Sequence, residues 1–223
     1  MKLSDETLSV LKNFAGINAN IVLNPGSTVK TMAESKTIMG TANISEEIPG
    51  QIGIYDLNEF LGVVNMFDEP DLLFDNEFKS VRVTEGKRAV KYFFSDPSIL
   101  TTPSKDVVMP SEDCSFTITA TDMNNIRRAS STLGVNHMIV QSHGGESKII
   151  VTDSENVTAN CFEIDVDIPS SNVDYKFIFN IGNLKLVADD YDVTISSRLI
   201  SKFKAQNNPI EYWVALEKNS TYG

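Results

Sequence analysis

The sequence has no long apolar segment and very little cysteine, and both shortages narrow the class of protein. None of the apolar runs in its 223 residues approaches the roughly 20 residues that a membrane-spanning helix needs, so we expect no membrane contact. The opening stretch 1–6 is polar and acidic, which fits neither a secretory signal nor a transit peptide. The two cysteines, Cys114 and Cys161, have neither zinc-site spacing nor the density of a disulfide framework. A reducing, cytoplasmic setting is the simplest expectation.

Histidine and the common catalytic motifs are equally scarce. Of the two histidines, His137 falls in an apolar strand, where we expect a packed side chain rather than a general base. His143 precedes two glycines at a predicted hairpin tip. The sequence contains no nucleophile elbow, phosphate-binding loop, dinucleotide fingerprint or zinc-protease motif. We therefore expect no catalytic activity and no cofactor.

Acidic residues cluster at two places that suggest metal ligands. Asp165 and Asp167 alternate along a predicted strand, which puts both on one face. Asp189, Asp190 and Asp192 fall at a predicted turn. We interpret both clusters as solvated surface and expect no metal. A small carboxylate-metal enzyme remains a rival interpretation.

The charge balance is strongly acidic. Asp and Glu total 30 against 19 for Lys and Arg, which gives a net charge of −11. The excess divides evenly between the two halves of the chain. Such a surface repels nucleic acid on average. Any DNA contact therefore requires basic side chains gathered on one shielded face.

A segment with several prolines separates two stretches of similar plan. Residues 95–110 hold three prolines among small polar residues. Because proline removes a backbone donor and restricts the residue before it, we expect an extended interdomain connector here. The flanking stretches, 1–94 and 111–223, each predict helices with one apolar face and many short strands. Such helices pack on sheets, so we expect two similar α+β domains built of antiparallel sheets.

Apolar periodicity and turn residues predict the individual elements. Ser4 is suited to cap the first helix and Gly16 to end it. We expect helices at 4–16, from about residue 56, at 122–133 and at 181–187. We expect strands at 21–23, 28–32, 37–44, 51–54, 72–74, 78–83, 89–94, 116–120, 137–141, 148–152, 157–164, 175–179, 191–196, 202–205 and 211–216.

Basic residues recur on the predicted helices. Lys12 lies opposite the apolar stripe of the first helix, with Lys2 just ahead of that helix. Arg127 and Arg128 lie on the polar side of the helix at 122–133, and Lys185 lies on the short helix that follows later. Taken singly, each is an ordinary solvated charge. Taken together, they form a set able to contact phosphates without reading bases.

Two apolar stretches suggest a second site. The connector carries Ile99, Leu100, Val107 and Val108, and the run 210–216 near the end of the chain includes Tyr212, Trp213 and Val214. One interpretation is simple core packing of an edge strand. The other is a hydrophobic pocket beside the connector for a partner's peptide, because apolar and aromatic anchors give short peptides their affinity. Both interpretations stay open from these residues alone.

Short motifs then follow one another in a specific order along nearly the whole chain. They are 1–4 (MKLS), 11–15 (LKNFA), 17–18 (IN), 42–45 (ANIS), 54–58 (IYDLN), 60–62 (FLG), 96–98 (DPS), 122–128 (DMNNIRR) and 212–217 (YWVALE). In this order and spacing they resemble the sliding clamps, the DNA polymerase processivity factors, of T-even-like bacteriophages.

The resemblance implies the DNA clamp fold and a homotrimeric ring. Each subunit would supply two similar domains, and helices would line the inner face around sequence-independent duplex DNA. The implied partners are the replicative DNA polymerase, an ATP-driven clamp loader, and the sigma-like factor and co-activator of late transcription. The implied setting is the cytoplasm of the infected bacterial host. Partner peptides would dock at Ile99, Leu100, Val107, Val108, Tyr212, Trp213 and Val214.

The resemblance also implies a basic channel for DNA. Its lining residues would be Lys2, Lys12, Arg127, Arg128 and Lys185. This chain departs from the family pattern because Asp5 shares the face of Lys12 and Ser131 stands where an arginine would fit. The second helix offers no cation at all. A ring-forming scaffold without a DNA role is the main rival interpretation.

Overall fold

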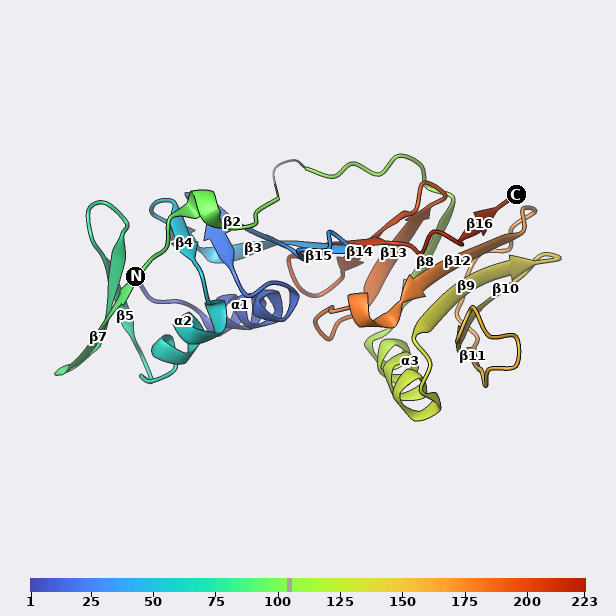
Figure 1. The fold of residues 1–223 in the computed structure, drawn as a ribbon, viewed down its shortest axis with the longest axis horizontal. Helices are drawn as coiled ribbons and strands as arrows, with labels where there is room; N and C mark the ends of the chain where they lie inside the picture. Colours follow the sequence, from blue (N-terminus) through green and yellow to red (C-terminus); the bar gives the residue numbers. More distant parts are fainter. Residues whose placement is uncertain (104–105) are drawn as a thin grey trace. The chain divides into compact units, whose positions relative to one another are not determined.

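A computed structural model describes residues 1–103 and 106–223 of the chain. They form two compact units, Met1–Asp106 and Val107–Gly223 (Figure 1). Each unit combines antiparallel sheets with one or two helices, and each is described by itself below. Among the described residues, no helix is long and apolar enough to cross a membrane.

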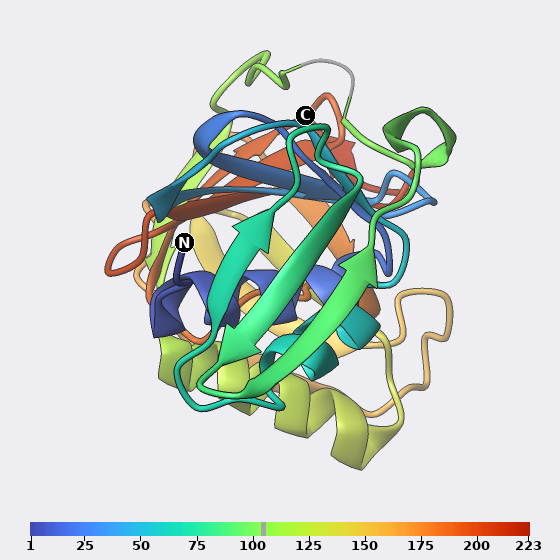
Figure 2. The same cartoon turned by 90° about the vertical axis from the view of Figure 1, so that its left-hand side faces the viewer.

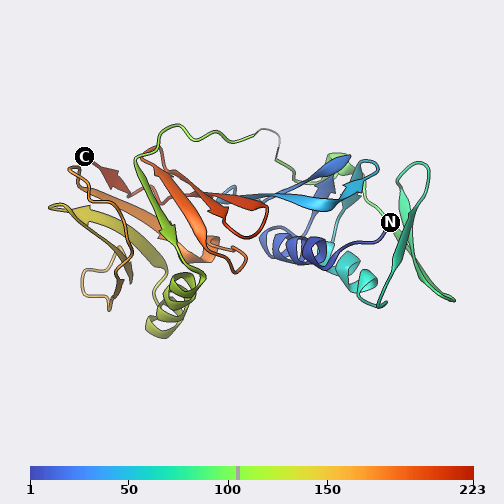
Figure 3. The same ribbon diagram turned by 180° about the vertical axis from the view of Figure 1, so that it is seen from behind.

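The first unit places two helices against a set of short strands. Its helices are α1 (Asp5–Ile17) and α2 (Leu57–Val64), followed by the 3₁₀ turn η1 (Pro97–Ile99). Its strands are β1 (Ile21–Leu23), β2 (Gly26–Met32), β3 (Ile38–Ile48), β4 (Ile52–Ile54), β5 (Asp71–Phe74), β6 (Ser80–Glu85) and β7 (Arg88–Phe93). β1 pairs with β4, β2 with β3, and β5, β6 and β7 form a three-stranded sheet, all antiparallel. α1 and α2 contact each other and lie on the same side of these strands (Figures 1 and 3).

Capping side chains begin both helices where the sequence predicts them. The Ser4 hydroxyl accepts a hydrogen bond from the Thr7 N–H at 3.2 Å. The Asp56 carboxylate accepts from the N–H groups of Asn58 and Glu59 at 2.9 and 3.1 Å. Each bond satisfies a donor that the first helical turn leaves without a partner. The predicted helices at 4–16 and from residue 56 are confirmed.

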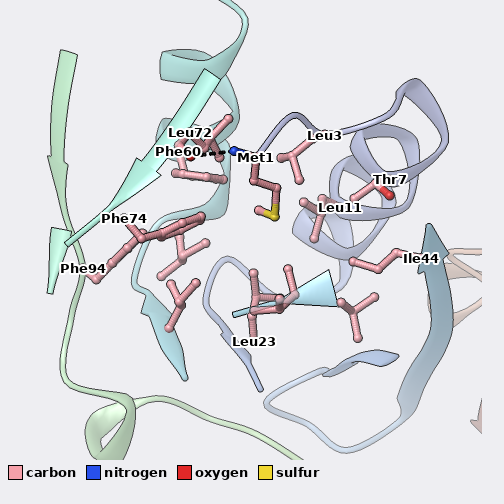
Figure 4. A pocket seen from close by; sticks show the side chains of 14 residues that line it. Met1, Leu3, Thr7, Leu11, Leu23, Ile44, Phe60, Leu72, Phe74 and Phe94 are labelled. Atoms are coloured by element: carbon pink, nitrogen blue, oxygen red, sulfur yellow. Dashed lines mark hydrogen bonds between the residues drawn. The ribbon is translucent and has the colours of Figure 1, made fainter. Parts of the chain in front are cut away.

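The core of the first unit encloses a small apolar cavity of about 20 Å³ (Figure 4). Met1 forms one wall, and its ammonium donates to the Leu72 carbonyl at 3.0 Å while the Leu72 N–H donates to the Met1 carbonyl at 2.8 Å. The first residue therefore continues the sheet beside β5. An apolar space that holds about one water-sized sphere is a packing gap and has no room for a cofactor.

The second unit also combines antiparallel strands with a helix. Its helix is α3 (Ala120–Leu133), and η2 (Ile181–Asn183) is a 3₁₀ turn. Its strands are β8 (Cys114–Ile118), β9 (His137–His143), β10 (Glu146–Thr152), β11 (Phe162–Ile164), β12 (Tyr175–Asn180), β13 (Tyr191–Ser196), β14 (Ile200–Ala205), β15 (Ile210–Ala215) and β16 (Thr221–Tyr222). One antiparallel sheet has the order β11-β10-β9-β12-β16, and another has the order β15-β14-β13-β8.

Both ends of α3 are capped. Thr119 and Asp122 form a capping box, and Gly134 ends the helix with a φ of 67° in the left-handed region that glycine tolerates. Met123 and Ile126 are buried on its inner face. The predicted helix at 122–133 is confirmed and begins two residues earlier, because Thr119 rather than a later residue supplies the cap.

Two predicted elements of the second unit are shorter than expected. The strand predicted at 157–164 forms only at 162–164, because turns occupy the preceding residues: the Asn156 N–H donates to the Asp153 carbonyl and the Ala159 N–H donates to the Asn156 carbonyl. The helix predicted at 181–187 stops at Asn183. Leu184 and Leu186 then alternate into the core, as in an extended chain.

The prediction that residues 189–192 form a solvated turn is wrong for Asp189, which is buried. Its carboxylate accepts hydrogen bonds from the side-chain amides of Asn207 and Asn208 at 2.7 and 2.6 Å. Burial opposes the charge, but the bonds from Asn208 and Asn207 outweigh it and hold the pKa of Asp189 below its usual range. Asp189 therefore ties the turn at 206–208 to the segment just before β13, whereas Asp192 is exposed as expected.

Candidate functional site

The polar face of α3 is the surface of the second unit with the features of a phosphate-contacting site. Arg128 is exposed there, with the neutral hydrogen-bonding side chains of Asn124 and Ser131 exposed on the same helix. A groove of about 380 Å³ runs beside this face. Its lining residues are Asn125, Arg128, Ala129, Thr132, Leu133, Cys161 and Phe162. One cation among neutral donors suits contact with a backbone phosphate better than reading of bases.

The structure separates the roles of the two adjacent arginines. The guanidinium of Arg127 donates to the carbonyls of Leu184 and Leu186, both at 3.2 Å. Arg127 is half-buried, whereas Arg128 is exposed. Arg127 therefore fastens α3 to the extended segment after η2, and Arg128 is the arginine that points its charge to solvent.

Lys185 lies on that same extended segment. The prediction that it lies on a helix is wrong, because η2 ends at Asn183. Lys185 is exposed between buried Leu184 and buried Leu186. Its placement next to the residues held by Arg127 brings it to the α3 side of the second unit.

The helix faces of the first unit carry little positive charge, as the sequence indicates. Lys12 is exposed on α1, but Asp5 and Glu6 are exposed on the same helix. Lys2 pairs with Glu69 at 2.9 Å, and this bond and the charge of Glu69 raise the pKa of Lys2. Lys12 is therefore the candidate phosphate contact of this unit.

The predicted peptide-pocket residues divide between the two units. In the first unit, Ile99 is 71% exposed, and Leu100 is buried. In the second, Val108 is 80% exposed and Val107 is half-buried. Tyr212 and Val214 are fully buried and Trp213 nearly so. Because no single unit holds the whole set, the pocket stays a proposal.

Both histidines have structural partners. The ring of His137 accepts from the Ser154 N–H at 3.1 Å, and His143 pairs with Asp174 at 2.8 Å where β9 turns into β10. Both histidine predictions are confirmed. Asp165 and Asp167 are exposed, but they follow β11 instead of lying within a strand. Within the described residues, no group of three or more His, Cys, Asp or Glu side chains could hold a metal ion.

Two residues that line the groove, Asn125 and Thr132, are not among the site residues predicted from the sequence. Asn125 lies three residues before Arg128 and Thr132 lies four residues after it, so all three share one helix face. This spacing is the sequence feature that predicts them. Neutral side chains give no charge pattern, so they escape a search for basic residues.

Comparison with solved structures defines the class of fold. The chain is similar to the structure described as the C-terminal region of FEN-1 bound to PCNA of A. fulgidus, with a TM-score of 0.72 and 14% identity over 99% of this chain and 98% of that one. This likeness shows the DNA clamp fold. The expectation of an α+β clamp fold with antiparallel sheets is therefore confirmed.

Sequence comparisons then identify the family. A model described as "DNA polymerase processivity factor" matches residues 4–98, and one described as "gp45 sliding clamp, C terminal" matches residues 115–218. The sliding clamp of Vibrio phage KVP40 is 31% identical over 97% of this chain and 99% of the relative. The sliding clamp of Enterobacteria phage T4 is 28% identical over 100% of this chain and 99% of the relative. The chain belongs to the bacteriophage sliding clamps, which are processivity factors of DNA polymerase.

Proposed function

We propose that three copies of this chain form a closed ring that encircles duplex DNA and tethers the replicative polymerase to it. Each copy supplies two clamp domains, 1–94 and 111–223, joined by the connector 95–110. The chain holds DNA by topology and performs no catalysis itself. The single observation that carries this proposal is the match of both family models, one to each unit.

The electrostatics support a ring that slides instead of gripping. With a net charge of −11, the outer surface repels DNA. A few phosphate contacts inside the ring give weak, sequence-independent attraction that falls with salt. Strong contacts would slow sliding, so an inner surface of few cations among neutral donors, such as the face of α3 around Arg128, suits this role.

The DNA-facing set consists of Lys2, Lys12, Arg127, Arg128 and Lys185, with different roles. Arg128 and Lys12 contact phosphates directly, because both are exposed on helices. Arg127 acts through its bonds to the segment that carries Lys185. Lys2 reaches DNA only by giving up its pair with Glu69.

A second part of the proposal concerns partners. Short hydrophobic peptides of the polymerase, of an ATP-driven clamp loader, and of a sigma-like late factor and its co-activator dock beside the connector. The proposed pocket combines Ile99, Leu100, Val107, Val108, Tyr212, Trp213 and Val214. The exposure of Ile99 and Val108 supports this pocket, since large apolar side chains at the surface mark interaction sites. This activity takes place in the cytoplasm of the infected bacterial host.

The test has two parts. Light scattering should give a mass near three times 24.6 kDa that falls on dilution, and a monomer at high concentration would contradict the proposal. In primer extension with clamp loader and polymerase, Arg128→Glu should give shorter products than the wild type. The variant should still assemble like the wild type. Lys36→Glu, the same charge change in an exposed turn, is the matched control. Equal product lengths for both variants would remove Arg128 from the channel.

The same experiment separates the rival function. A ring-forming scaffold without a DNA role would assemble normally. Primer extension would then give products of the same length with the protein and without it. Lys12 and Arg128 are exposed on helices, and Lys185 is exposed on the segment after η2. Exposed cations can contact phosphates, which favours the clamp over this scaffold.

A further inference from the structure

The turn η1 presents one large apolar side chain at the surface of the first unit. Ile99 is 71% exposed, whereas its neighbour Leu100 is buried. Figure 2 shows η1 as the green coil at the upper right, at the margin of the unit. Ile99 is therefore the apolar residue of this turn that a partner can reach, and Leu100 is the one that attaches the turn to the unit.

The segment before the turn is bonded to β4. The Ser95 N–H donates to the Gly53 carbonyl at 2.8 Å, and the two residues form an antiparallel bridge. A Cβ on Gly53 would lie 2.5 Å from the Ser95 carbonyl oxygen and 3.1 Å from Leu100 Cδ1. The connector thus approaches β4 as closely as a glycine allows, which fixes the near end of η1.

A single side chain holds the segment after the turn. Oδ1 of Asn20 accepts a hydrogen bond from the Thr101 N–H at 3.1 Å, although the two residues are 81 positions apart in the chain. Asn20 lies in the connection between α1 and β1. Within the turn, the Asp96 carboxylate accepts from the Ser98 N–H at 2.9 Å. η1 is therefore held at both ends, with Ile99 between them.

We propose that Asn20 is a positioning residue for partner docking: its bond to Thr101 holds η1 so that Ile99 meets an apolar side chain of the partner's peptide. A segment that is already ordered loses little conformational freedom on binding, so its preorganisation strengthens the complex. Leu100 serves the same purpose from the buried side of the turn. This inference rests on the proposed docking of partner peptides beside the connector and gives that site a residue from outside the connector.

Polymerase binding tests this role. Biolayer interferometry measures the dissociation constant of the protein for immobilised replicative polymerase. Asn20→Ala removes the acceptor and should weaken binding about three- to tenfold, because η1 must then be ordered when the partner binds. Asn20→Asp keeps an oxygen acceptor and should bind nearly as tightly as the wild type. Asn76→Ala, at an exposed asparagine in the turn between β5 and β6, is the matched control and should bind like the wild type.

Two further measurements separate positioning from a general loss of structure. Ile99→Ala should weaken binding, and the double variant Asn20→Ala/Ile99→Ala should bind no more weakly than Ile99→Ala, because the bond acts through Ile99. Hydrogen exchange at the Thr101 amide should quicken in Asn20→Ala but not in Asn20→Asp or Asn76→Ala. Circular dichroism verifies that each variant is folded.

The outcomes separate this inference from the proposed function. If the wild type binds polymerase and Asn20→Ala binds equally well, the positioning role is wrong and the proposed pocket stands. If the losses from Asn20→Ala and Ile99→Ala add in the double variant, Asn20 does not act through Ile99 and the inference is again wrong. If the wild type does not bind polymerase, both the pocket and the positioning role are wrong.

Discussion

The ring of Phe78 lies directly against the backbone of Gly50, so that a Cβ at residue 50 would come within 2.4 Å of two ring atoms. Phe78 adopts a φ of 53°, a left-handed conformation that is strained for an aromatic residue. It lies in the turn between β5 and β6, whereas Gly50 lies between β3 and β4. The contact fixes the three-stranded sheet of the first unit onto the rest of that unit.

Gly50→Ala should destabilise the protein by about 1–3 kcal/mol, because the added methyl would overlap the half-buried ring of Phe78. Urea unfolding followed by circular dichroism measures the change. Gly62→Ala is the matched control: Gly62 lies within α2 with no atom within 4 Å of its would-be Cβ. That substitution should stabilise by about 0.5–1 kcal/mol. Equal effects of the two variants would contradict the proposed contact.

The adjacent arginines of α3 should differ in their effect on folding. Arg127→Met removes two charge-assisted hydrogen bonds while keeping most of the side-chain stem, so the free energy of unfolding should fall by about 1–3 kcal/mol. Arg128→Met changes only a solvated charge and should stay within about 0.5 kcal/mol of the wild type. Thermal or urea unfolding of the two variants and the wild type measures these changes in the free energy of unfolding. A larger loss for Arg128→Met would reverse the assigned roles.

Asp189 should make the second unit sensitive to acid. Because its pKa in the folded state is lowered, its stabilising contribution is complete above the unfolded value of about 3.9. The contribution is lost as the pH falls through the folded pKa. Asp189→Asn should therefore cost about 1.5–3 kcal/mol at pH 7, and the gap to the wild type should narrow below about pH 4. A gap that is constant with pH would show that the charge of Asp189 does not contribute.

The two thiols should react at very different rates. Cys161 is exposed beside the α3 groove, whereas Cys114 is buried and burial raises the pKa of its thiol. A disulfide-exchange reagent should modify one thiol per chain quickly and the second only on unfolding. Cys161→Ser should abolish the fast phase. A fast phase that survives this substitution would show that Cys114 is accessible.

Local chemistry made much of the fold predictable. Ser4 and Asp56 identify the helix starts because a capping side chain acts on N–H groups two or three residues away. The hairpin tip after His143 follows from its two glycines, whose φ values of 60° and 88° are left-handed. Such interactions lie within a few residues, so the sequence alone carries them.

Long-range interactions account for the wrong predictions at 184–187 and at Asp189. Residues 184–187 have helical periodicity, but Arg127, 57 residues earlier, takes the Leu184 carbonyl. Asp189 is in a run of acidic residues typical of a turn, but Asn207 and Asn208 bury it from 18 and 19 residues away. At the candidate site, Arg128 could be predicted from its helix face. The different role of Arg127 could not be predicted, because it depends on hydrogen bonds to the distant residues Leu184 and Leu186.

The central claim is that the ring holds DNA by encircling it, and release on cutting tests this most directly. The protein is loaded by a clamp loader and ATP onto nicked circular duplex and then separated by gel filtration at raised salt, which weakens phosphate contacts. We predict that it stays with the circle and is released when one restriction cut makes the DNA linear. Equal retention on circular and linear DNA, or loss from the uncut circle at the same salt, would contradict encirclement.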